Sequence, residues 1–111
     1  MMKRTYGIQT LLNLLKQYTP LSDPYSSEDN VVIYLQDVTT HIDYYILSWD
    51  PDFMDFFALV DPLCCSNVLD LETVPLCTLE NSVLFYKIYP KNKQIHWKKI
   101  YKRILPLKNG I

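Results

Sequence analysis

The chain has 111 residues, of which 49% are apolar and 14% aromatic, and its formal net charge is −1. This length suits one domain with its own core, and the apolar and aromatic content excludes a disordered chain. Its two glycines, Gly7 and Gly110, lie near the ends, which excludes a glycine-rich phosphate-binding loop. We therefore expect a single domain over residues 1–111.

The charged residues are segregated along the sequence. No lysine or arginine occurs between Lys16 and Lys87, and all twelve acidic residues lie within that interval. The small net charge therefore hides an acidic central body between two basic ends. We expect the body and the ends to attract different partners.

The first predicted element is a helix over residues 6–18. Thr5 has the right side chain to cap its start. Its apolar residues recur at the spacing of one buried helix face: Ile8, Leu11, Leu12 and Leu15. Residues 19–30 contain prolines, serines and acids without periodicity, so an exposed loop is expected there.

Two β-rich runs follow, over residues 31–36 and 42–49, and the polar break between them predicts an antiparallel hairpin. Asp50 then has the side chain of a helix N-cap, and Pro51 suits the first helical position. A short second helix is expected to end before Pro62. The following aromatic and apolar residues would share one of its faces: Phe53, Phe56, Phe57 and Val60.

Two more strands are predicted over residues 74–78 and 82–89, and an amphipathic helix over residues 94–105, ended by Pro106. One side of this last helix is apolar: Trp97, Ile100, Tyr101, Ile104 and Leu105. The other side is basic: Lys98, Lys99, Lys102 and Arg103. The element order α-β-β-α-β-β-α predicts an α+β fold, with two or three helices packed on an antiparallel sheet of about four strands.

The residues that might bind a metal or act in catalysis lack the spacing of such sites. Potential zinc ligands are Cys64, Cys65, Cys77, His41 and His96. Neither C-x-x-C nor H-x-x-x-H spacing occurs, and adjacent cysteines rarely bind one metal together. The aspartates between Asp50 and Asp61 are interpreted as helix caps and solvated side chains. We expect no metal, no cofactor and no enzymatic activity.

The cysteines and the N-terminal segment bear on the compartment. Three cysteines, two of them adjacent, do not resemble the even disulfide framework of a small secreted domain. The first 15 residues lack the small-residue cleavage site of a secretory signal. No apolar run reaches the roughly 20 residues that a transmembrane helix needs. We expect an intracellular protein in a reducing compartment, the cytoplasm or nucleus.

Surface chemistry is the basis for the expected function. An acidic, tyrosine-rich body and a basic helix predict a small accessory protein that binds other proteins, as an inhibitor, an adaptor or a small subunit of a larger assembly. Candidate contact residues on the helix are Trp97, Lys98, Lys99, Tyr101, Lys102 and Arg103. Candidate contact residues on the strands are Tyr34 and Tyr45.

Several alternatives remain open at this point. The basic aromatic C-terminal segment could bind nucleic acid or an anionic membrane surface, or its apolar face could complete the protein's own core. Lysine normally protects sheet edges against association, and the first two predicted strands contain none. Pairing with a partner strand, or a homodimer through a sheet edge, is a further hypothesis.

Overall fold

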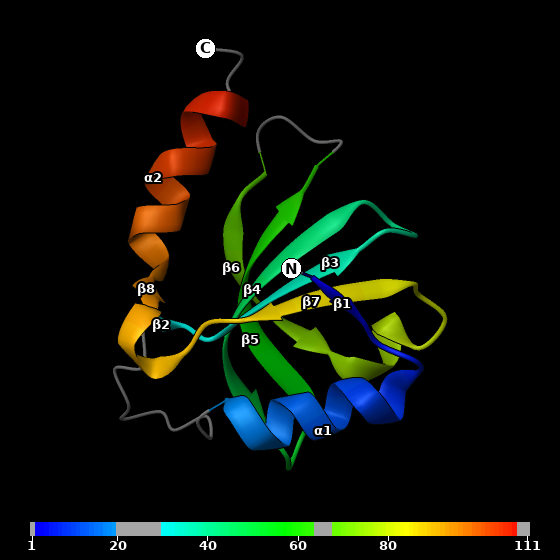
Figure 1. The fold of residues 1–111 in the computed structure, drawn as a ribbon. Helices are drawn as coiled ribbons and strands as arrows, with labels where there is room; N and C mark the ends of the chain where they lie inside the picture. Colours follow the sequence, from blue (N-terminus) through cyan, green and yellow to red (C-terminus); the bar gives the residue numbers. More distant parts are fainter. Residues whose placement is uncertain (1, 20–29, 64–67, 109–111) are drawn as a thin grey trace.

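A six-stranded antiparallel sheet forms the centre of the structure (Figure 1). The computed structural model describes residues 2–19, 30–63 and 68–108. The strand order is β1-β7-β3-β4-β5-β6. The strands are β1 (Lys3–Arg4), β3 (Ile33–Asp37), β4 (Ile42–Asp50), β5 (Asp55–Pro62), β6 (Asp70–Pro75) and β7 (Leu84–Ile88).

Two α-helices, two 3-10 helices and a second small sheet complete the described part of the chain. The helices are α1 (Ile8–Tyr18), α2 (Trp97–Lys108), η1 (Leu76–Leu79) and η2 (Lys91–Lys93), and the small sheet pairs β2 (Asn30–Val31) with β8 (Ile95–His96). The predicted α+β class, the single compact domain and the antiparallel sheet are confirmed. The main sheet has six strands rather than about four. No helix in the described ranges is long and apolar enough to span a membrane.

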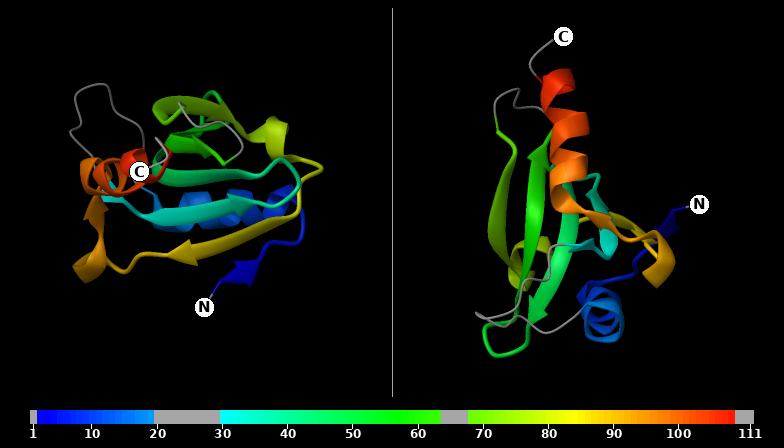
Figure 2. Two further views of the ribbon diagram at one scale, coloured as in Figure 1. Left: turned by 90° about the horizontal axis from the view of Figure 1, so that it is seen from above. Right: turned by 90° about the vertical axis from the view of Figure 1, so that its left-hand side faces the viewer.

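Side chains that alternate along the strands of the sheet pack in two separate hydrophobic cores. In β5, Phe56 and Ala58 belong to the core under α1, whereas Leu59 belongs to the core under α2. Successive strand residues point to opposite faces, so the two helices use opposite faces of the sheet. Figure 1 shows α1 crossing below the sheet and α2 standing along its side, and the views in Figure 2 keep the two helices apart.

The predicted second helix is wrong, because Asp50 starts a hairpin turn that leads into β5. The Asp50 carboxylate accepts hydrogen bonds from the backbone N–H groups of Asp52 (3.0 Å) and Phe53 (3.4 Å). Met54 then takes a left-handed φ of 52°. A carboxylate caps backbone N–H groups in the same way at a helix start and in such a turn, so the sequence signal is shared. Both faces of β5 are largely buried, so its apolar residues lack the alternation that marks a strand.

The hairpin predicted between the first two β-rich runs is confirmed as β3–β4. Its turn repeats the chemistry of the Asp50 turn. The Asp37 carboxylate accepts hydrogen bonds from the N–H groups of Thr39 (3.0 Å) and Thr40 (3.2 Å), and His41 has a φ of 58°. A chain without glycine in its body therefore builds both turns from an aspartate and a left-handed residue with a full side chain.

Several predicted boundaries also differ from the structure. Thr5 does not cap α1, because the helix starts at Ile8 and its N-cap is Gly7, with a φ of 87° and no side-chain cap hydrogen bond. The Thr5 N–H instead donates to the backbone oxygen of Leu84. The strand predicted over 74–78 ends at Pro75 and continues as η1. The loop predicted over 19–30 falls, apart from its two end residues, outside the described residues.

Helix α2 starts and ends three residues later than predicted, and Pro106 lies inside it. Residues 95–96, expected in the helix, form β8 instead. Proline lacks an N–H and disfavours a helix interior, so other contacts must hold the last turn. The Lys108 ammonium provides one, because it donates hydrogen bonds to Asp61 Oδ1 (2.6 Å) and to the backbone oxygen of Pro62 (2.9 Å).

The sheet edges are not the strands that the sequence suggested. β3 pairs with β4 and β7, and β4 pairs with β3 and β5, so both lysine-free strands are interior. The two edges of the main sheet are β1 and β6. Missing lysine in β3 and β4 therefore reflects burial between neighbours rather than an open edge.

Candidate interaction site on helix α2

The inner face of α2 is buried against the protein's own sheet. Ile100, at the centre of this face, is only 5% exposed. The core that it joins is made of Val31, Leu47, Leu59 and Leu69, with partly buried residues of α2 around them: Trp97, Tyr101, Ile104 and Leu105. The apolar face of the helix is therefore occupied, and a partner can reach the docked helix only through its outer face.

The outer face of α2 carries four exposed cations: Lys98, Lys99, Lys102 and Arg103. None of them forms an ion pair within the described ranges. Two exposed lysines of η2, Lys91 and Lys93, precede the helix in the chain. We call the four α2 residues the cationic face.

The start of α2 has an unfavourable charge distribution. Lys98 and Lys99 occupy its first turn, which contains no acidic residue. The N-terminal end of a helix carries partial positive charge, so a cation there costs about 0.3–1 kcal/mol in stability. The His96 ring offsets part of this cost, because its Nδ1 accepts a hydrogen bond from the Lys98 N–H (3.1 Å). These lysines are therefore not explained by the stability of the helix.

Aromatic rings border the cationic face at its N-terminal end. The Trp97 ring stacks on His96, with 6.0 Å between ring centroids and an interplanar angle of 28°, and meets the edge of Tyr101 at 6.1 Å. The Lys98 ammonium lies 5.8 Å from the centroid of the Trp97 ring. Because Trp97 and Tyr101 also pack against the core under α2, these rings are held in place.

The C-terminal end of α2 is fixed by the ion pair between Lys108 and Asp61, which lies beside a second carboxylate, that of Asp43. The side chains of Lys108 and Asp61 are only 8% and 5% exposed. Asp61 is opposite Asp43 in the β4–β5 ladder. The Tyr34 hydroxyl donates to Asp43 Oδ2 (2.7 Å), while Asp43 Oδ1 is buried without a partner in the described part of the chain.

The carboxyl group of Asp43 is costly to ionise. Burial raises its pKa, the hydrogen bond from Tyr34 lowers it, the neighbouring Asp61 raises it, and Lys108 lowers it, in decreasing order of effect, with a net upward shift. The folded protein therefore binds this proton more readily than the unfolded chain. As the pH rises from the unfolded value, near 3.8, through the folded pKa, the stabilisation of the folded state is lost.

We expect Asp43→Asn to raise the free energy of unfolding at pH 7 by about 0.5–1 kcal/mol, because it removes a buried charge and keeps an acceptor for Tyr34. The gain should shrink as the pH falls toward 4, where the native carboxyl group becomes protonated. Urea unfolding at pH 4, 5, 6 and 7 measures it, with the exposed Asp52→Asn as the control. A loss of stability at pH 7 would contradict the conclusion that the ionised Asp43 destabilises the folded protein.

The two strand tyrosines predicted as contact residues lie next to each other. The rings of Tyr34 and Tyr45 stack with 5.0 Å between their centroids. Both are half-buried on the sheet face that α2 uses, and burial raises the pKa of each hydroxyl. They therefore belong to the structure beneath α2 and are separate from the exposed cationic face.

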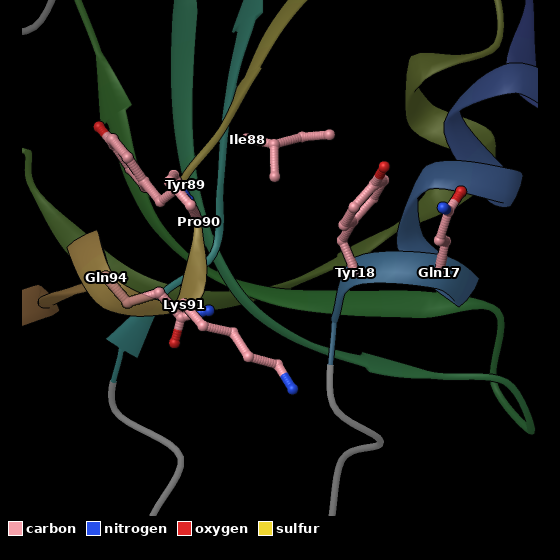
Figure 3. Close-up of a pocket in the computed structure, with 7 residues that line it drawn as sticks. All are labelled: Gln17, Tyr18, Ile88, Tyr89, Pro90, Lys91 and Gln94. Atoms are coloured by element: carbon pink, nitrogen blue, oxygen red, sulfur yellow. The ribbon is translucent and has the colours of Figure 1, made fainter.

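An open cleft of about 640 Å³ lies between the end of α1 and the segment that contains η2. Figure 3 shows Gln17 and Tyr18 coming from α1 on one side, and Pro90, Lys91 and Gln94 on the other. No local sequence pattern indicates this cleft, because its two walls, Gln17–Tyr18 and residues 88–94, come from opposite ends of the chain. Among the described residues that line it, no pair of groups is arranged for acid–base or nucleophilic chemistry.

A second feature missed from the sequence is an exposed apolar hairpin tip. The Phe53 side chain is 77% exposed, and Met54 is 45% exposed. They border a groove of about 360 Å³ whose apolar lining comes from α1 and η1: Ile8, Leu12, Leu76 and Cys77. The Asp50 and Asp55 carboxylates flank the tip in sequence.

Within the described residues, no group of three or more histidine, cysteine or acidic side chains could hold a metal ion. Cys77 is an exposed free thiol in η1, and Cys64 and Cys65 lie outside the described residues. His41 occupies the β3–β4 turn and His96 the start of α2.

Comparison of the chain with protein families, with curated proteins and with solved structures gives no match. No function can therefore be transferred from a relative. The function has to be argued from the chemistry of the surface itself.

Proposed function

We propose that this protein is a non-enzymatic interaction protein that binds an acidic surface of another protein through the cationic face of α2. It would act as an adaptor, an inhibitor or a small subunit of a larger assembly. The observation that carries this proposal is the pair Lys98 and Lys99, which are exposed and have no ion pair with any described residue, at the helix end where cations are disfavoured. A negatively charged partner would compensate both charges.

The way in which α2 is held supports the proposal. Ile100 is buried in its first turn, and Lys108 pairs with Asp61 at its end. A surface ordered before binding loses less conformational entropy when a partner docks. Cations on a rigid helix therefore present a fixed charge pattern, which favours specificity and fast association.

The hairpin tip provides a second contact of different chemistry. Phe53 is a large exposed aromatic side chain with aspartates on both sides, and aromatic anchors inside a polar rim are typical of protein interfaces. The acidic body would thus meet one partner surface, and the cationic face another. This division matches a component that joins two proteins.

The test is affinity capture from a lysate of the native host with two matched variants. In the first, all four residues of the cationic face, Lys98, Lys99, Lys102 and Arg103, are changed to Glu. In the second, four exposed cations elsewhere, Lys3, Arg4, Lys16 and Lys87, are changed to Glu, which alters the net charge equally. We expect the first variant to recover its partner at least about tenfold less well, and the second to recover it like the unmodified chain.

Equal recovery by both variants would contradict the proposal, because the effect would then depend on net charge alone. Circular dichroism and urea unfolding check that both variants are folded. Since all eight side chains are exposed, we expect each substitution to change stability by no more than about 0.5 kcal/mol.

Nucleic-acid binding is a second candidate function, favoured by the Lys98 ammonium lying 5.8 Å from the Trp97 ring centroid. Proteins that bind single-stranded nucleic acid use this combination, because bases stack on the ring and phosphates are attracted to the cation. However, Trp97 and Tyr101 already pack against the core, which limits the ring surface available for bases. Titration with a 20-nucleotide single strand decides between the two: four phosphate contacts predict a slope of about −3 for log Kobs against log salt.

A further inference from the structure

The two edges of the main sheet differ in length and charge. β1 has two residues, Lys3–Arg4, and both are basic. β6 pairs with β5 over six residues and contains no lysine and no bulge, and its proline is the last residue, Pro75. Natural sheets protect edges with short strands, lysine, proline or bulges. The β1 edge is therefore protected, whereas most of the β6 edge is open.

The pairing of β6 with β5 shows which backbone groups are free. The Leu76 N–H donates to the backbone oxygen of Met54 (3.0 Å), so this opposed pair is a hydrogen-bonded one. Hydrogen-bonded and non-bonded pairs alternate along an antiparallel ladder. The N–H and C=O groups of Leu71 and Thr73 therefore point away from β5, and in the described part of the chain they have no partner.

Pro75 agrees with this orientation. It occupies the next outward-pointing position after Thr73, and proline has no N–H to leave unpaired. The outer edge of β6 thus offers the N–H and C=O groups of Leu71 and Thr73 to an added strand, whereas the C=O of Pro75 already accepts a hydrogen bond from the Thr78 hydroxyl (2.7 Å). The side chain of Thr73 is exposed, so it does not block access.

The charges beside the edge define what kind of strand fits. Asp70 and Glu72 are exposed and lie on the same face of the sheet. No lysine or arginine occurs anywhere between Lys16 and Lys87 to neutralise them. Antiparallel pairing of β6 with β6 of a second copy would bring four carboxylates onto one face, which disfavours self-pairing. A strand with lysine or arginine at alternate positions would instead be attracted.

We propose that the outer edge of β6 binds an extended basic segment of a partner protein as a seventh strand of the sheet. Its backbone groups would pair with Leu71 and Thr73, and its basic side chains with Asp70 and Glu72. This surface is separate from the cationic face of α2 and attracts the opposite charge. The two proposals can therefore fail independently.

The test uses a fluorescent seven-residue peptide in which lysine alternates with valine. Its control has the same sequence, with N-methyl groups on the backbone amides of one edge. Thr73→Pro removes an outward N–H that has no partner among the described residues, and Thr73→Val keeps that N–H. We expect Thr73→Pro to weaken peptide binding at least about fivefold, Thr73→Val to change it less than twofold, and the N-methylated peptide not to bind.

Amide hydrogen exchange on the unmodified chain gives an independent readout if Thr73→Pro does not fold. Peptide binding should slow exchange at Leu71 and Thr73. Three results would overturn the proposal: no binding of the lysine peptide at 1 mM, equal binding to Thr73→Pro and Thr73→Val with no new protection at the two amides, or a dimer that protects these amides without peptide.

Discussion

We expect Asp37→Ala to lower the free energy of unfolding by about 3 kcal/mol, because a buried carboxylate with three hydrogen bonds is lost. Asp37 is only 1% exposed. Its Oδ1 accepts the N–H groups of Thr39 and Thr40, and its Oδ2 accepts the Ser82 hydroxyl at 2.8 Å. The single side chain thus closes the β3–β4 turn and ties it to the segment before β7.

Asp50→Ala is the matched control for this prediction. Asp50 caps its turn through the same two kinds of backbone contact, but in a partly exposed position. We expect it to cost only about 1 kcal/mol. Chemical denaturation of both variants at pH 7 makes the comparison. Equal losses would mean that the burial of Asp37 and its bond to Ser82 add nothing to the turn.

We expect Lys108→Met to destabilise the protein by about 3 kcal/mol at pH 7. The substitution keeps an apolar side chain of similar length and removes the cation from Asp61, whose side chain is 5% exposed. Breaking one partner from a buried pair leaves an uncompensated charge, which costs about 3–5 kcal/mol. The neighbouring Asp43 adds to the cost, because Lys108 normally lowers the pKa of its carboxyl group.

The pH dependence and a second substitution identify the cause of that loss. Protonation of Asp43, whose pKa is raised by burial, removes one of the negative charges near Lys108, so the deficit of Lys108→Met should shrink as the pH falls from 7 to 4. Adding Asp61→Asn should restore part of the stability at pH 7. Lys102→Met, on the exposed side of α2, serves as the control and should change stability by less than about 0.5 kcal/mol. A deficit independent of pH would contradict an electrostatic cause.

Local sequence patterns predicted the parts of the fold that depend on local chemistry. The spacing of Leu11 and Leu15 marked α1, and the polar break around Asp37 marked the β3–β4 hairpin. The segment after Asp50 was wrong, because an aspartate caps a turn and a helix with the same hydrogen bonds. The segment of β5 forms a strand because it pairs with β4 on one side and β6 on the other. A single sequence does not show these long-range pairings.

The cationic face was predicted from the sequence, but its availability was not. Ile100 falls on the opposite side of a helix from Lys99 and Lys102, and this follows from the local sequence alone. What covers the apolar side is not local, because Val31 and Leu59 come from distant segments of the chain. The same holds for the ion pair between Asp61 and Lys108, which joins residues 47 positions apart.

The sheet edges show the same limit most clearly. The absence of lysine did not identify the edge strand, because it directed attention to the runs that became β3 and β4, which are interior. Strand order decides which strand lies at the edge, and it comes from long-range pairing. β6 also lacks lysine, and it is the longer of the two edge strands; its outer side has no partner in the described part of the chain.

Site-specific photo-crosslinking in the native host tests the central claim most directly. A photoreactive amino acid replaces Lys102 on the cationic face in one variant, and the exposed Lys16 of α1 in the control. If α2 binds an acidic protein surface, the Lys102 position should give a discrete protein adduct that resists nuclease treatment and is absent from the Lys16 variant. No adduct at the Lys102 position, or the same adducts at both positions, would contradict the claim.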